Sequence, residues 1–157
     1  MVLDSSVIVK SILKPGRWLP EEVYRRELET HHKARDLVKT LKSSDLIALI
    51  PYPVIVEVAA VISRLAGKEL AEKVVESLKT TKNYTIVYEE EYRDKALKVA
   101  LQTGSSGFDA YIIGLAWDRD ALLITDDEPM SKHAETLGVK VVLLRNANLR
   151  DIMRQLH

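Results

Sequence analysis

The sequence has 157 residues, a formal net charge of zero and no cysteine, and 46% of its residues are hydrophobic. This length and composition predict one domain over residues 1–157 with a substantial core. The lack of cysteine excludes disulfide bonds and thiolate chemistry. The sequence has no run of about 18 apolar residues and no basic leader followed by an apolar stretch. We therefore expect a soluble, cytoplasmic protein that does not enter a membrane.

Charge is distributed unevenly along the chain. Residues 10–45 and 132–157 carry more Lys and Arg than Asp and Glu, whereas acids predominate in residues 46–131. Zero net charge argues against a dedicated nucleic-acid binding module. The layout suits an acidic cation-binding centre with basic flanks that could meet a polyanion. Ordinary solvated helix faces would give the same pattern, so charge alone does not decide between these two interpretations.

Short apolar runs alternate with longer helical patterns, which is typical of a parallel sheet with helices on both faces. The predicted strands are residues 2–4, 47–50, 85–88, 121–125 and 139–144. The predicted helices are residues 5–13, 21–43, 53–66, 68–80, 90–103, 108–118, 130–137 and 147–155. Residues 14–20, with two prolines and a glycine, break the pattern between the first two helices and indicate a loop.

Acidic residues follow the first and the fourth predicted strands. Asp4 ends the first strand, and Asp126 and Asp127 end the fourth. In an open α/β sheet, ligands bind at the carboxyl ends of the strands, so these acids are candidate site residues. Each of these acids could instead have a purely structural role. Asp4 could cap the helix that follows it. One of Asp126 and Asp127 could likewise cap the helix that begins near Pro129.

Two further acids lie within predicted helices. Asp109 is near the start of an apolar helix, where a negative charge is favourable near the positive end of the helix dipole. Glu57 lies in the stretch Val54–Ile62, which is apolar nearly all round and therefore looks mostly buried. An unpaired buried carboxylate is costly, so Glu57 needs a partner from elsewhere in the fold. A distant basic side chain is one possible partner, and a metal ion is another.

A divalent cation accounts for all four acids at once. Clustered carboxylates repel one another and raise each other's pKa unless a cation offsets the repulsion. Hard oxygen ligands without cysteine suit Mg²⁺ or Mn²⁺, as one or two ions. Such ions with bound water are common in phosphodiester hydrolysis. The candidate metal ligands are Asp4, Glu57, Asp109 and one of the neighbours Asp126 and Asp127.

Four segments resemble the acidic motifs of PIN domains, in the order in which that family has them. They are Val2–Val7, Val56–Val58, Phe108–Ala116 and Leu123–Asp127. Within the family the chain is similar to the VapC-like ribonuclease toxins of prokaryotic toxin–antitoxin modules. The resemblance implies a three-layer α/β/α sandwich with a central parallel sheet of four or five strands. It also implies that Asp4, Glu57, Asp109 and Asp127 bind the metal and act in catalysis.

The resemblance carries further expectations. Ser6, Thr125 and Asp126 would orient the metal-binding carboxylates from a second shell. The substrate would be RNA, the partners a cognate antitoxin protein and a second copy of the chain. An antitoxin would place a basic side chain in the acidic site and an amphipathic helix in a groove beside the N-terminal helices. We expect the segment from Lys14 to His32 to border that groove.

The chain departs from the compact toxins in two places. The segment from Lys14 to His32 lengthens the distance between Asp4 and Glu57. The neighbours Asp126 and Asp127 leave the last metal ligand ambiguous. Because alternate strand residues face opposite ways, we expect only one of the two to bind metal, and the resemblance favours Asp127.

Other functions fit part of the pattern. A phosphatase with an aspartyl nucleophile at the first strand would carry a second Asp where this chain has Ser6. A nuclease of RNA processing outside toxin–antitoxin modules, or a non-enzymatic RNA-binding or assembly module, would share the PIN-like fold. Trp18, in the predicted loop, could stack on RNA bases. The adjacent His31 and His32 lack the spacing that places two imidazoles on one helical face.

Overall fold

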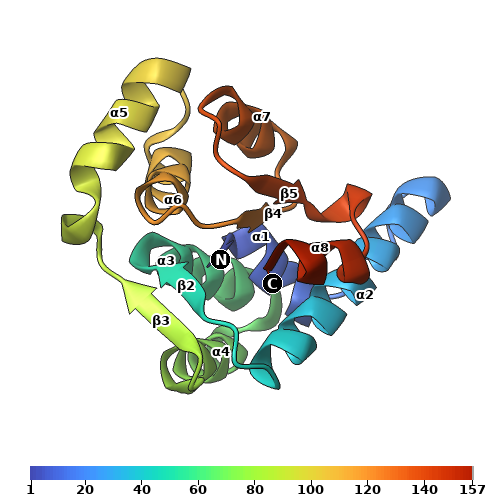
Figure 1. Cartoon of the computed structure of the whole chain (residues 1–157). Coiled ribbons are helices and arrows are strands. Elements are labelled where there is room, and N and C mark those ends of the chain that lie inside the picture. The colour runs from blue at the N-terminus through green and yellow to red at the C-terminus, as the bar shows by residue number, and fades with distance from the viewer. Residues whose placement is uncertain (157) are drawn as a thin grey trace.

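Five short runs of largely buried residues form the central sheet. The computed structural model describes residues 1–156, and its strands all run parallel in the order β3-β2-β1-β4-β5 (Figure 1). The strands are β1 (Val2–Leu3), β2 (Ala48–Pro51), β3 (Tyr84–Val87), β4 (Leu123–Thr125) and β5 (Val141–Leu143). The structure confirms the predicted α/β fold and its parallel sheet.

Helices cover both faces of the sheet, as right-handed crossovers between parallel strands require. One layer holds α1 (Ser5–Ile12), α2 (Glu21–Lys42), α3 (Tyr52–Ala66) and α4 (Lys68–Thr80), with α8 (Leu149–Leu156) against α2 (Figure 1). The other layer holds α5 (Arg93–Thr103), α6 (Gly107–Asp118) and α7 (Glu128–Thr136). None of the helices among residues 1–156 is both long and apolar enough to cross a bilayer.

Two predicted helices begin later than their patterns suggested. Residues Glu89–Glu91 form a short 3-10 helix, and α5 starts only at Arg93. Tyr92 lies between these two helices, and its ring is buried edge-on against that of Tyr111. A second 3-10 helix, Leu144–Asn146, follows β5 and delays the start of α8 to Leu149.

The strand order reverses between β1 and β4. The chain leaves β1 toward β2 on one side, and β4 enters on the other side. Leu3 is in register with Ile124, so Asp4 and Thr125 follow side by side at the carboxyl end of the sheet. The backbone N–H of Asp4 donates to the carbonyl of Ile124 at 3.1 Å. This reversal is where ligands bind in open α/β sheets.

One glycine sets the distance between α5 and α6. A Cβ atom on Gly114 would lie 2.8 Å from the Cα of Ala96 and 2.9 Å from its backbone nitrogen. Glycine therefore lets the two helices pack with their backbones close together. This contact fixes α6, which carries Asp109 toward the carboxyl end of the sheet.

Candidate active site

Asp4 lies at the start of α1, but its carboxylate does not cap that helix. Its side chain is almost completely buried and accepts hydrogen bonds from two hydroxyl groups, with a third hydroxyl in contact. Ser6 donates to Oδ2 at 2.5 Å, Thr125 donates to Oδ2 at 2.8 Å, and Ser5 contacts Oδ1 at 3.2 Å. Burial raises the pKa of Asp4, and these hydrogen bonds offset only part of that effect.

The directions of two hydroxyl groups are fixed by backbone groups that follow β4. Ser6 Oγ accepts from the N–H of Asp126 at 2.9 Å, and Thr125 Oγ1 accepts from the N–H of Asp127 at 3.0 Å. Since a hydroxyl that accepts from an N–H still has its own proton to give, both protons go to Asp4 Oδ2. That oxygen is thereby saturated, and Oδ1 is the oxygen with capacity left for a ligand.

Glu57 is half-buried. Its helix α3 is buried at Val54, Ile55, Val58 and Ile62, but it is not covered all round, since Val56 is 56% exposed. Glu57 meets the hydroxyl of Ser5, which donates to its Oε2 and also touches Asp4. One serine thus joins the acid of α3 to the acid of β1.

Asp109 lies in the first turn of α6, where Ser106 caps the helix by accepting from the N–H of Asp109 at 3.1 Å. With Ser106 as the cap, the Asp109 carboxylate is not needed for that purpose. Burial, followed by the negative charges of Asp127 and Asp4, raises the pKa of Asp109. Asp109 is therefore close enough to these two carboxylates to be affected by their charge.

Asp126 and Asp127 have different surroundings. Asp127 caps α7 through Oδ1, which accepts from the N–H of Met130 at 2.8 Å, and it also faces the cavity described below. Asp126 is buried away from that cavity, where Arg145 donates to it from Nε at 3.0 Å and Lys10 contacts its Oδ2. Burial alone would raise the pKa of Asp126, but Arg145 and Lys10 outweigh it and hold the pKa below its usual range.

The acids Asp4, Glu57, Asp109 and Asp127 line one cavity of about 230 Å³. Ser5 and Ser6 contribute its other polar groups, and the apolar part of its wall is formed by Val9, Val61, Phe108 and Met130. Four segments that are far apart in the sequence thus bring their carboxylates to the carboxyl end of β1 and β4. All four predicted site residues are brought together, whereas Asp126 is turned away.

The donor set of this cavity fits a hard divalent cation. Within residues 1–156, no three His, Asp or Glu side chains are already close enough to form a complete ligand shell. Burial is the main cause of the raised pKa values of Asp4 and Asp109, so ionising these acids in the cavity is costly. A bound Mg²⁺ would offset this cost, and because it retains several waters it needs only a few carboxylates as ligands.

Sequence reasoning missed two polar residues around the site, Lys10 and Arg145. Lys10 follows Ser6 by one helical turn, and this spacing on α1 was a usable signal. Arg145 is 19 residues beyond Asp126, and nothing in the local sequence links the two. His31 is buried, and its Nδ1 lies 2.6 Å from the carbonyl oxygen of Lys10, so its role is structural.

Residues 1–136 match the family model of the PIN domain, and the chain belongs to that family. In structure it is similar to the crystal structure of FitAcB from Neisseria gonorrhoeae, with a TM-score of 0.62 and 16% sequence identity. That match covers 93% of this chain and 99% of the other, and it shows a shared fold. A comparison with curated proteins found no match. The predicted PIN membership is confirmed, whereas the VapC-like assignment remains a prediction.

Proposed function

We propose that the chain is a divalent-metal-dependent endoribonuclease and the toxin of a toxin–antitoxin pair. PIN domains are generally nucleases. The observation that carries the proposal is the single cavity lined by the carboxylates of Asp4, Glu57, Asp109 and Asp127. Four acids gathered at one place would be a liability without a cation, because each raises the cost of ionising the others.

The side chains of the cavity have separate roles in this proposal. Asp4 presents Oδ1, because Ser6 and Thr125 already occupy Oδ2. Glu57, Asp109 and Asp127 supply the remaining carboxylate oxygens, enough for one or two ions. When Mg²⁺ or Mn²⁺ is bound, it supplies the positive charge that activates a water and stabilises the leaving oxygen of the phosphodiester.

Cleavage of a single-stranded RNA oligonucleotide tests the proposal. We expect cleavage with Mg²⁺ or Mn²⁺, none in excess chelator, and none of a DNA oligonucleotide of the same sequence. Glu57→Gln and Asp109→Asn should abolish it, whereas Glu69→Gln, an exposed acid on α4, should leave it intact. Full-rate RNA cleavage in excess chelator would contradict the metal dependence, and equal cleavage of DNA would contradict the RNA assignment.

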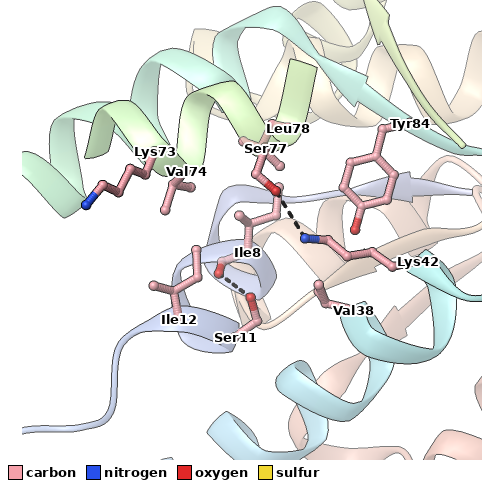
Figure 2. A pocket seen from close by; sticks show the side chains of 10 residues that line it. All are labelled: Ile8, Ser11, Ile12, Val38, Lys42, Lys73, Val74, Ser77, Leu78 and Tyr84. Atoms are coloured by element: carbon pink, nitrogen blue, oxygen red, sulfur yellow. Dashed lines mark hydrogen bonds between the residues drawn. The ribbon is translucent and has the colours of Figure 1, made fainter. Parts of the chain in front are cut away.

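An antitoxin is the partner that we propose for this chain, and a second cavity supports the proposal. It measures about 230 Å³ and lies on the far side of α1 from the acidic cavity. Its walls are largely apolar and come from α1, the C-terminal half of α2, α4 and β3 (Figure 2). None of the lining residues comes from the segment from Lys14 to His32. If the antitoxin binds in this cavity, that segment does not line the groove, contrary to our expectation.

The second cavity offers both apolar and polar contacts. Lys42 spans its edge and donates to Ser77 Oγ at 3.1 Å (Figure 2). The hydroxyl of Tyr84 is buried with no hydrogen-bond partner. An amphipathic antitoxin helix would insert an apolar side chain here, and an Arg or Lys of the same partner would cross α1 to the acidic cavity. The two cavities lie on different faces of α1. A helix with its side chains is about 10–12 Å across, so one partner segment can reach both places.

Growth of cells tests the toxin assignment. Expression of the chain alone should slow growth, and co-expression with the small open reading frame next to its gene should restore it through a stable complex. Val74→Glu, in the second cavity, should weaken that complex, whereas Leu65→Glu, on the exposed side of α3, should not. If the chain is harmless and binds no neighbouring gene product, the toxin assignment is wrong and only the proposal of a metal-dependent nuclease remains.

We also propose that the chain forms a homodimer. Leu97 and Leu101 are one turn apart on α5 and are 60% and 77% exposed. Exposed apolar side chains at this spacing are of the kind that a self-complementary interface buries. Light scattering should give twice the mass of the chain, and Leu97→Glu with Leu101→Glu should give the monomer mass. A monomeric parent protein would contradict the proposal.

A further inference from the structure

The buried Asp126 carboxylate is surrounded by charge on the side away from the cavity. Arg145 donates to it from its backbone nitrogen at 3.1 Å, from Nε at 3.0 Å and from Nη2 at 3.0 Å. Nη2 also donates to the backbone carbonyl of Asp126 at 2.8 Å. Lys10 bridges Asp126 and Glu27, the latter at 2.6 Å. Two acids, Asp126 and Glu27, thus pair with Arg145 and Lys10, and the exposed Arg26 also approaches Glu27 at 3.4 Å.

Helix α2 braces this cluster from behind. The ring of His31 contacts the carbonyl of Lys10 at 2.6 Å, and Lys33 donates to the carbonyl of Arg145 at 2.8 Å. With Glu27, three residues of one helix therefore hold the two bases in place. The first half of α2 belongs to the segment that lengthens the chain between Asp4 and Glu57, and its contacts lead to Asp126.

The cluster connects to the acidic cavity through one serine. The N–H of Asp126 donates to Ser6 Oγ at 2.9 Å, which leaves the Ser6 proton for Asp4 Oδ2 at 2.5 Å. The N–H and the carbonyl of Asp126 belong to successive peptide units that meet at its Cα, and a small rotation about the bonds of this Cα would release Ser6. Arg145 holds both the carboxylate and the carbonyl of Asp126, and these contacts oppose such a rotation.

We propose that Arg145 and Lys10 are positioning residues for the metal-binding carboxylates. They hold Asp126, whose backbone N–H orients Ser6, and Ser6 in turn orients Asp4. The proposal rests on the metal-dependent function proposed above. Stability alone is a weak reason for such a cluster, because buried ion pairs often contribute little net stability. Orientation of a ligand by the groups behind it is a stronger reason, since such groups commonly change metal affinity by about 10–100-fold.

A positional role and a simple charge effect predict different results. Arg145→Lys keeps the positive charge but loses the two guanidinium contacts with the Asp126 carboxylate. A charge effect then predicts unchanged Mn²⁺ affinity, whereas a positional role predicts weaker Mn²⁺ binding. Arg145→Met leaves an extra negative charge near the cavity, so a charge effect predicts tighter Mn²⁺ binding and a positional role again predicts weaker binding. Arg150→Lys, at an exposed position on α8, is the matched control.

Calorimetric titration with Mn²⁺ on Arg145→Lys, Ser6→Ala and the double variant tests the proposal. We expect each single variant to bind about 10–100-fold more weakly, and the double variant to bind no more weakly than the weaker single. Affinity of Arg145→Lys within about twofold of the parent, or effects that multiply in the double variant, would overturn it.

A parent protein that binds no Mn²⁺ would contradict the proposed function. In that case, metal-free crystal structures of the parent and of Arg145→Lys would still test the positional role. In Arg145→Lys the Ser6 hydroxyl should have turned away from Asp4. An unchanged contact between Ser6 and Asp4 would overturn the proposal.

Discussion

Asp126 and Asp127 are consecutive residues whose carboxylates lie in different environments, one in a buried ion cluster with Arg145 and the other at the wall of the acidic cavity. The alternation of side chains at the end of β4 produces this separation. The sequence alone does not say which of the two faces the cavity. The structure places Asp127 there.

Amide substitutions separate the two neighbours. Asp127→Asn should lose most RNA cleavage, because it removes a carboxylate from the cavity. Asp126→Asn should retain more activity per folded molecule but lower the free energy of unfolding by about 1–3 kcal/mol, since it removes the charged partner of the half-buried Arg145 and Lys10. Oligonucleotide cleavage and urea unfolding on both variants would check this. The reverse order of activity would show that Asp126 is the ligand.

The metal-free protein should lose stability as the pH rises past the range in which Asp109 ionises. Asp109 has a higher pKa in the folded protein than the ordinary value of 3.8, so the folded state binds its proton more tightly than the unfolded state does. Stability therefore falls as the pH rises from the unfolded value through the folded one, and the loss persists at neutral pH.

Thermal unfolding in chelator measures this effect. Asp109→Asn should have a higher Tm than the parent at pH 7, by about 2–4 °C for each kcal/mol gained. The difference should shrink toward pH 4. Asp94→Asn, the same change in the first turn of α5, is the control and should show no such pH-dependent gain. A lower Tm for Asp109→Asn at pH 7 would mean that the Asp109 charge is stabilised by other groups.

Divalent cations should raise the Tm of the parent by mass action on the folded state. At a concentration 100 times the Kd, the gain is about 2.7 kcal/mol. Glu57→Gln should lose most of this response to Mg²⁺ or Mn²⁺, because one of the carboxylates of the cavity is gone. Scanning fluorimetry over a range of metal concentrations would show it. An equal increase in Tm for the parent and for Glu57→Gln would mean that the ion binds outside this cavity.

Gly114 should tolerate no side chain. The Cβ of Gly114→Ala would approach the backbone of Ala96 to 2.8 Å, and two backbones cannot separate without disturbing the core. We expect a loss of about 1–3 kcal/mol in the free energy of unfolding. Gly107→Ala has open space around the new Cβ and serves as the control. Urea unfolding with no difference between the two variants would argue against the close packing of α5 and α6.

Local sequence patterns predicted much of the fold. Apolar runs with period 2 or 3.6 located the strands and helices to within a few residues, and Asp4 and Asp127 stood out because they end buried strands. Burial within a helix was harder to judge. Glu57 looked enclosed because its neighbours are apolar, yet Val56 is 56% exposed, since an apolar sequence does not say which neighbours cover it.

Local sequence patterns could not predict the contacts between residues on different strands. The bond between Thr125 and Asp4 joins residues 121 positions apart, and it depends on the register of β1 and β4. The forked contact of Arg145 with Asp126 depends on where the chain turns after β5. Neither the strand order nor the turn can be read from periodicity.

The Asp127 carboxylate serves two structures at once, because it starts α7 and forms part of the cavity wall. Its Oδ1 holds the N–H of Met130 at 2.8 Å, and a helix cap of this kind contributes about 1 kcal/mol. A cation that draws this carboxylate inward competes with the first turn of α7, whereas one that takes only Oδ2 leaves the turn intact. Amide hydrogen exchange at Met130, in the first turn of α7, therefore measures how far a bound cation draws the Asp127 carboxylate away from its role as a helix cap.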